Sequence, residues 1–288
     1  MGGLKITDLV RWGPGRRAAF IDWLRYEIQR VQSQRDSLEK RWRNYLELYR
    51  APEPKGIRRF PFEGAPLALV RIEGQVPPYA LLAQRTIKTI AELRGKTIMV
   101  GGEKDITRVY LERMLTPNGI KAGEYDLLYA GSTLARFAAL QSGAVSAAIL
   151  FPPLNFRAEA AGFTNLGFIV DYAKNLPFSG ISVNTSWATR NKERLERFLA
   201  AYTKAVVWLN NGNNRSEAVR ILVEASKQSP EDTEKSYDMY RKIDFFETKG
   251  EVSKKKVAEI IDILRSDMRD KPLDINRLFL PNVTRVTE

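Results

Sequence analysis

The residues best suited to chemistry stand in three short loops, each directly after a predicted buried strand. The loops begin or centre on Gly101-Gly102, Ser132-Thr133 and Phe151-Pro152. Glycines let a backbone come close to a ligand, hydroxyl groups form hydrogen bonds, and a phenylalanine ring offers a flat apolar wall. Groups of these kinds suit the binding of a small molecule.

The elements that must position these loops alternate between strands and helices. Strands are predicted at 97–100, 125–129 and 145–151, and helices at 106–115 and 133–141. This alternation predicts an α/β fold with a largely parallel sheet covered by helices. Because ligands of such sheets bind outside the carboxyl ends of the strands, the three loops are expected to converge on one cleft. The candidate ligand-binding residues are Gly101, Gly102, Thr107, Ser132, Thr133, Phe151 and Pro152.

The charge of the ligand stays open at this point. Two of the loops lead into helix N-termini, whose free N–H groups and positive dipole suit an anion. Asp105, however, is placed to cap the helix that starts at Ile106 and would occupy those N–H groups, which leaves room for a neutral or cationic ligand. Only an inward-pointing Lys104 would offset that carboxylate. Ser132 is also a helix cap in any fold, and Phe151 suits a core as well as a ligand wall.

The composition of the 288 residues narrows the classes of function. The chain has no histidine and no cysteine, so it lacks the most common acid–base side chain, thiolate nucleophiles and the usual zinc, haem and iron–sulfur ligands. We therefore expect no catalytic residue, no metal and no cofactor. The longest apolar stretches are short strand-like runs, far below the roughly 20 residues of a membrane span. The first residues show no secretory signal, so a cytoplasmic location is possible.

The first 65 residues differ from the rest. They hold 14 basic and 8 acidic residues, and so they carry +6 of the total net charge of +12. Their apolar residues predict a long helix at 17–49 with one apolar stripe from Phe20 to Tyr49, ended by the prolines at 52 and 54. The stripe could support self-association through this helix. The basic surplus could serve nucleic acid, although a solvated basic surface explains it more simply.

The ordered set of segments from Ile87 to Tyr240 resembles the solute-binding components of ABC importers for nitrate, sulfonates, taurine and thiamine-pyrimidine precursors. The segments that carry the resemblance are IKTIAELRGKTI (87–98), GG (101–102), AGSTLAR (130–136) with LQSG (140–143), AAILFPP (147–153), EAAGF (159–163), and the tail from KPL (271–273) to LF (278–279). The resemblance starts at about Pro66 and covers roughly three quarters of the chain.

The resemblance implies a two-lobed, periplasmic-binding-protein-like fold of type 2 that binds a small organic or anionic ligand between its lobes. Lobe two is expected at 94–171, and the remaining part of lobe one at 66–93 and 172–288. The family implies a periplasmic location and an ABC permease as partner, and no enzymatic activity. A pyrimidine synthase of thiamine biosynthesis resembles the same family, but it needs an active-site histidine and cysteines, which this chain lacks.

Two departures from the family pattern stand out. The first ligand loop continues with Glu103, Lys104 and Asp105, where small hydroxyl-bearing residues are usual. The first units of lobe one are replaced by the segment 1–65, which resembles the N-terminal region of tailed-phage portal proteins and predicts an incomplete lobe one. That segment is explained either by a junction between sequences from two sources or by a helical N-terminus specific to one lineage. A structural or nucleic-acid-associated role through it is the alternative function.

Overall fold

The computed structural model describes residues 66–103, 105–264 and 274–288. The predicted helix at 17–49, with its self-association and nucleic-acid roles, and the whole segment 1–65 lie outside the described residues. The strand predicted at 97–100 is found with those bounds, and those predicted at 125–129 and 145–151 are found at 126–129 and 147–150. The strands are β1 (Leu67–Gly74), β2 (Ala80–Ala83), β3 (Thr97–Val100), β4 (Asp126–Tyr129), β5 (Ala147–Leu150), β6 (Thr164–Phe168), β7 (Ser179–Asn184), β8 (Glu251–Ser253) and β9 (Arg285–Thr287).

The helices follow the predicted caps and stops. Asp105 caps α3 and Ser132 caps α4, each through its side-chain oxygen, and Gly143 takes the left-handed conformation just after α4 (φ 76°). The α-helices are α3 (Ile106–Leu115), α4 (Thr133–Gln141), α5 (Leu154–Ala160), α6 (Val170–Ala173), α7 (Thr185–Arg190), α8 (Lys192–Asn210), α9 (Arg215–Ser226), α10 (Pro230–Lys242) and α11 (Lys254–Leu264). Short 3-10 helices stand at Ile90–Leu93, Thr116–Asn118, Gly212–Asn214 and Ile275–Leu278. No helix in the described ranges is both long enough and apolar enough to span a bilayer.

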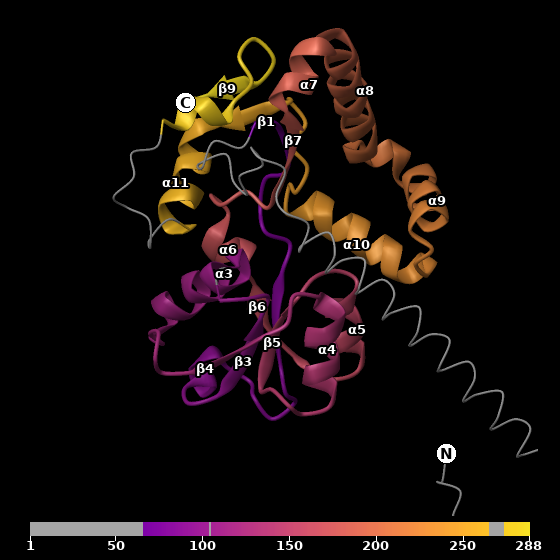
Figure 1. Ribbon diagram of the computed structural model, residues 1–288. Coiled ribbons are helices and arrows are strands. Elements are labelled where there is room, and N and C mark those ends of the chain that lie inside the picture. Colours follow the sequence, from indigo (N-terminus) through magenta and orange to yellow (C-terminus); the bar gives the residue numbers. More distant parts are fainter. Residues whose placement is uncertain (1–65, 104, 265–273) are drawn as a thin grey trace, which may run out of the picture. The chain divides into compact units, whose positions relative to one another are not determined.

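Lobe two is built on a five-stranded sheet with the order β4-β3-β5-β2-β6. The strands β4, β3 and β5 are parallel, as predicted, but β2 runs antiparallel to both β5 and β6. All four residues of β5 are fully buried, because helices cover both faces of the sheet (Figure 1). One apolar cluster joins the sheet to α3 and α6, and the other joins it to α4 and α5.

Two sequence-based boundaries shift in the structure. The strand predicted at 166–170 is found at 164–168, and Val170 instead starts α6. Residues 66–93 were assigned to lobe one, whereas β2 pairs within the sheet of lobe two. The reason is that β2 is apolar on both faces and completes the buried centre of that sheet. We therefore propose that lobe two begins near Tyr79.

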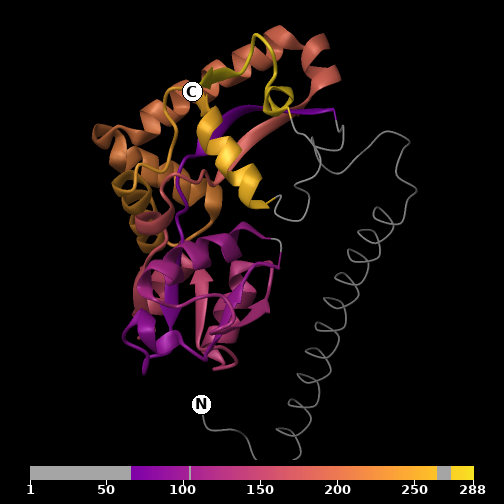
Figure 2. The same ribbon diagram turned by 90° about the vertical axis from the view of Figure 1, so that its left-hand side faces the viewer.

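The described part of lobe one contains two strand pairs, β1 with β7 and β8 with β9, together with α7 to α11. The β1–β7 pair is antiparallel. The C-terminal segment lies beside β1, where Leu69 forms a bridge with Phe279, and α11 packs its apolar face on the same side (Figure 2). The two segments of lobe one thus come together from both ends of the described chain.

Candidate functional site

The three predicted loops meet at one edge of the lobe-two sheet, which we call the loop edge. Val100 of β3 lies opposite Tyr129 of β4, and Met99 lies opposite Ala148 of β5. Because these strands are parallel and in register, the loops that follow them leave the sheet side by side. The loop edge therefore contains all seven candidate ligand-binding residues, some in the loops and some in the first turns of the helices that follow.

The first loop is held closed by its own side chains. The backbone N–H of Gly101 donates to the hydroxyl of Thr107 over 2.7 Å, and that hydroxyl donates to Asp105. Asp105 also accepts from the backbone N–H of Thr107 over 2.9 Å. Thr107 is only 2% exposed. Its hydroxyl is thus engaged within the loop, and Thr107 positions the loop rather than reaching into solvent.

Gly101 and Gly102 provide a direct test of this closed loop. A Cβ at Gly101 would lie 2.5 Å from the Asp105 carboxylate and 3.0 Å from the Thr107 hydroxyl, whereas one at Gly102 meets nothing closer than 3.5 Å. We expect Gly101→Ala to lower the free energy of unfolding by about 1–2 kcal/mol, because it displaces the cap of α3. Gly102→Ala, the matched control, should change it by less than about 0.5 kcal/mol in urea unfolding. Equal effects of the two changes would contradict the observed loop geometry.

The first turn of α4, which follows the second loop, contains a buried charge that the sequence interpretation missed. Arg136 of α4 is 2% exposed. Its Nε donates to the carbonyl of Ile149 over 2.8 Å, and its Nη1 donates to the carbonyls of Ala130 and Gly131 over 2.8 and 3.2 Å. Its Nη2 donates to the Thr133 hydroxyl over 2.9 Å. Arg136 therefore ties the ends of β4 and β5 to the first turn of α4.

A sequence signal for Arg136 does exist. It lies three residues after Thr133 and four before the buried Leu140, on the inward face of the predicted helix. An arginine on such a face needs several acceptors, and strand-end carbonyls can supply them. Ser132, by contrast, is exposed, and its hydroxyl accepts from the N–H of Ala135 over 3.1 Å as a helix cap.

Tyr79 joins the loop edge from the segment between β1 and β2. Burial raises the pKa of its hydroxyl, the Arg136 charge lowers it, and the Asp105 charge adds a smaller increase. Burial also lowers the pKa of Arg136, but a guanidinium remains protonated at any ordinary pH. The charges of Arg136 on α4 and of Asp105 in the first loop both act on this tyrosine. Tyr79 is a neutral O–H group there.

The third loop ends in an aromatic cluster. The ring of Phe151 lies 5.6 Å from that of Tyr79 and stacks on Phe178 at 5.6 Å, with Tyr240 at 6.3 Å. Phe178 and Tyr240 belong to lobe one, so Phe151 lies where the two lobes meet. Pro152 is buried, and a cis peptide bond joins it to Pro153. Phe151 is therefore neither a free wall nor part of the lobe-two core, but a half-buried ring in contact with residues from both lobes.

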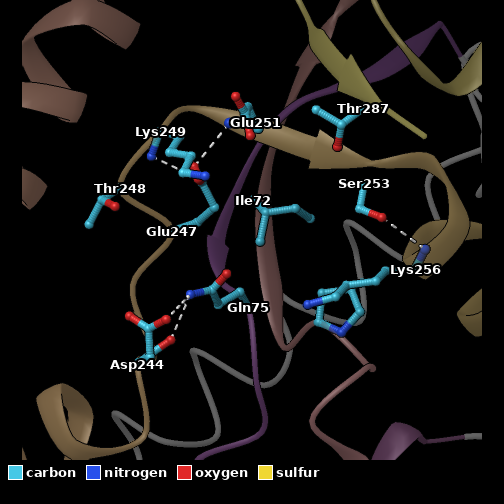
Figure 3. A pocket seen from close by; sticks show the side chains of 11 residues that line it. Ile72, Gln75, Asp244, Glu247, Thr248, Lys249, Glu251, Ser253, Lys256 and Thr287 are labelled. Atoms are coloured by element: carbon cyan, nitrogen blue, oxygen red, sulfur yellow. Dashed lines mark hydrogen bonds between the residues drawn. The ribbon is translucent and has the colours of Figure 1, made fainter.

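A polar cavity of about 260 Å³ is lined by residues of β1, of β8 and of the loop between α10 and β8 (Figure 3). Gln75 projects into it and donates to the carbonyl of Asp244 over 2.8 Å and to its carboxylate over 3.1 Å. Pro177 lines the cavity, and its carbonyl accepts from Tyr110 of α3 over 3.2 Å, so the cavity adjoins lobe two at this point. None of the seven candidate ligand-binding residues lines it.

The comparisons with known proteins agree with the fold. A family model described as NMT1/THI5-like matches residues 63–216. No curated protein matches the sequence. Identities to the solved structures are low, so these likenesses concern the fold.

Three solved structures illustrate the likeness. The alkanesulfonate-binding protein SsuA from Xanthomonas axonopodis pv. citri, bound to MOPS, is 18% identical, with 79% of this chain and 76% of that chain covered and a TM-score of 0.59. The ligand-binding component of an ABC-type import system from Staphylococcus aureus is 16% identical, with 77% and 74% covered and a TM-score of 0.63. The desulfurization enzyme DSZB is 12% identical, with 76% and 78% covered and a TM-score of 0.57.

Proposed function

This chain belongs to the NMT1/THI5-like family, and from that premise we propose that it is the solute-binding component of an ABC importer. We propose that it holds a small organic anion at the loop edge, between its two lobes. Solved structures with this fold include an alkanesulfonate-binding protein and a ligand-binding component of an import system. An ABC permease as partner and a location outside the cytoplasm are part of the same proposal.

The observation that carries the choice of an anion is the buried guanidinium of Arg136. Four of its five N–H groups are accounted for by the bonds described above, which fix its position. Burial lowers the pKa of Arg136, whereas the charge of Tyr79, the charge of Asp105 and a hydrogen bond to Tyr79 raise it. The Asp105 carboxylate is already bonded to Thr107. Both helix N-termini at this edge are already capped, α3 by Asp105 and α4 by Ser132, so the attraction for a negative charge rests on Arg136.

The organic part of the ligand is proposed from the aromatic side chains. Tyr79 lies near Arg136, and its ring contacts the rings of Phe151 and Phe178. A ligand with an anionic head and an apolar or aromatic body matches this pairing of a fixed positive charge with rings. A neutral or cationic ligand, which the sequence left open through Asp105, is less suited because that carboxylate is engaged in the loop.

We propose binding rather than catalysis. The same fold also occurs in a desulfurization enzyme, so the fold alone does not decide between the two. This chain contains no histidine or cysteine, and the ionisable side chains at the loop edge include Tyr79, Glu103, Asp105 and Arg136. An arginine that stays charged and a tyrosine with a raised pKa are poor proton carriers near neutral pH. They are good hydrogen-bond donors to an anion.

Calorimetric titration of the full chain with taurine, a longer alkanesulfonate, nitrate and a pyrimidine tests the proposal. We expect an alkanesulfonate to bind and a neutral pyrimidine to bind more weakly. The double variant Tyr79→Phe/Thr133→Val removes two hydroxyl groups near Arg136, and it should weaken binding by about 10- to 100-fold, since each lost hydrogen bond to a charged group costs roughly 1.5 kcal/mol.

The control for this experiment is Thr189→Val on α7, where the hydroxyl donates only to the carbonyl of Thr185. Its affinity should match that of the unmodified chain. Tight binding that is unchanged in the double variant would show that the ligand does not bind at the loop edge. Absence of binding by every anion tested would count against the solute-binding proposal itself.

A further inference from the structure

A second cavity, of about 420 Å³, lies within lobe one. It is bounded by β1, α8, the loop at 249–250 and the C-terminal residues 283–285, and none of the loop-edge residues lines it. Its apolar wall is formed by Val70, Leu199, Ala200 and Val283. Small-molecule sites have volumes of roughly 300–1,000 Å³, so this cavity has room for a small organic ligand.

A buried arginine stands among the lining residues. Arg71 of β1 is 1% exposed, and its Nη1 donates to the hydroxyl of Thr203 over 2.7 Å. Its Nη2 donates to the carbonyl of Glu247 over 2.5 Å and lies 3.5 Å from that carboxylate. Its Nε–H has no acceptor among the described residues. This Nε is itself buried, so Arg71 acts on the cavity through its positive charge, which favours an anionic group.

The Glu247 carboxylate is largely engaged by other groups. It accepts from the backbone N–H groups of Lys249, Gly250 and Glu251 over 2.7, 2.6 and 3.0 Å. This bonding spreads its negative charge over the loop that closes one side of the cavity. Arg71 is therefore held rigidly, and its charge is only partly offset.

The rim of the cavity is basic. Lys204 and Lys249 line it, and neither forms an ion pair with a described residue. Arg285 also lines it and pairs with Glu251 at 3.6 Å, while the acidic lining residue Glu196 pairs with Lys192 at 3.7 Å. With Arg71, four positive side chains and one negative side chain face an aliphatic wall. This combination favours a ligand with an anionic head and an aliphatic body.

The geometry points to a second ligand site in lobe one that binds small aliphatic carboxylates or similar organic anions. The head of the ligand lies toward Arg71, Lys204 and Lys249, and its chain lies along Leu199 and Ala200 of α8. This site is separate from the loop edge, and it stands or falls independently of the solute-binding proposal.

Titration of the full chain with sodium octanoate at low ionic strength, followed by calorimetry, tests this second site. We expect saturable binding of one octanoate in this cavity. Ala200→Trp places a large ring in the cavity from an exposed helix position and should weaken binding by at least about tenfold. Ala201→Trp is the matched control, because Ala201 is the adjacent exposed residue of α8 and does not line the cavity. It should leave the affinity unchanged.

Two further comparisons test whether octanoate binding depends on charge or only on hydrophobicity, and whether it occurs in this cavity or at the loop edge. Lys204→Gln should weaken octanoate binding about three- to fivefold, and Lys242→Gln on α10 should not. Octylamine, which has the same chain and the opposite charge, should not bind. Equal binding of octylamine, or unchanged octanoate affinity in Ala200→Trp, overturns the inference. Loss of octanoate binding in Tyr79→Phe/Thr133→Val, with Ala200→Trp unaffected, would place the anion at the loop edge and also overturn it.

Discussion

Replacing Arg136 by methionine is expected to lower the free energy of unfolding by about 3–5 kcal/mol. The substitution keeps most of the side-chain volume but removes every donor of the guanidinium. The carbonyls of Ile149 and Ala130 then lose partners at 2.8 Å in a part of the molecule where Arg136 is 2% exposed. Each buried acceptor left without a donor costs roughly 1–3 kcal/mol.

Urea unfolding followed by circular dichroism measures this effect. Arg190→Met on α7 is the control, because Arg190 is exposed and forms no ion pair with the described residues. Its effect should stay within about 0.5 kcal/mol. A loss below about 1 kcal/mol for Arg136→Met would mean that the guanidinium does not hold the loop edge together.

Replacing Glu247 by alanine is expected to cost a similar amount, about 3–5 kcal/mol. The change leaves the charge of Arg71 buried without its carboxylate and removes the acceptor of three backbone N–H groups. Breaking a buried pair by removing one partner is far more costly than removing an exposed pair, because the remaining charge keeps its desolvation cost.

The comparison for Glu247 is Glu224→Ala on α9. Glu224 is exposed and pairs with Arg220 of the same helix at 3.4 Å. An exposed pair of this kind contributes about 0–1 kcal/mol. Thermal unfolding of the two variants at one ionic strength should therefore show a clear shift for Glu247→Ala and a small one for Glu224→Ala. Similar shifts would indicate that water reaches the Arg71–Glu247 pair.

Much of lobe two could be predicted because its signals are local. The alternation of buried and exposed residues defines β1 and β3, and Asp105 and Ser132 cap α3 and α4 where the sequence predicts them. Caps, turns and strand runs depend on residues within one or two turns of each other, so a single sequence reveals them. The meeting of the three loops follows as well, since parallel strands in register share an edge.

The roles of individual side chains at that edge were less predictable. Thr107 is a good candidate by type, yet its hydroxyl is used within the loop by Gly101 and Asp105. Phe151 was open between core and ligand wall, and its partners Phe178 and Tyr240 lie 27 and 89 residues further along the chain. The sequence carries no local signal for contacts at such separations.

The α/β class, the caps of α3 and α4, and the three loops that contain the candidate residues follow from local patterns in the sequence. The tertiary structure alone decided which polar groups those loops enclose. Arg136 meets the carbonyl of Ile149 where α4 packs against β5, and Arg71 meets Glu247 across 176 residues of chain. A buried charge needs several partners at once, and folding brings these together from distant segments. The fold class and the caps therefore depend on neighbouring residues, whereas the positions of the buried charges depend on the complete fold.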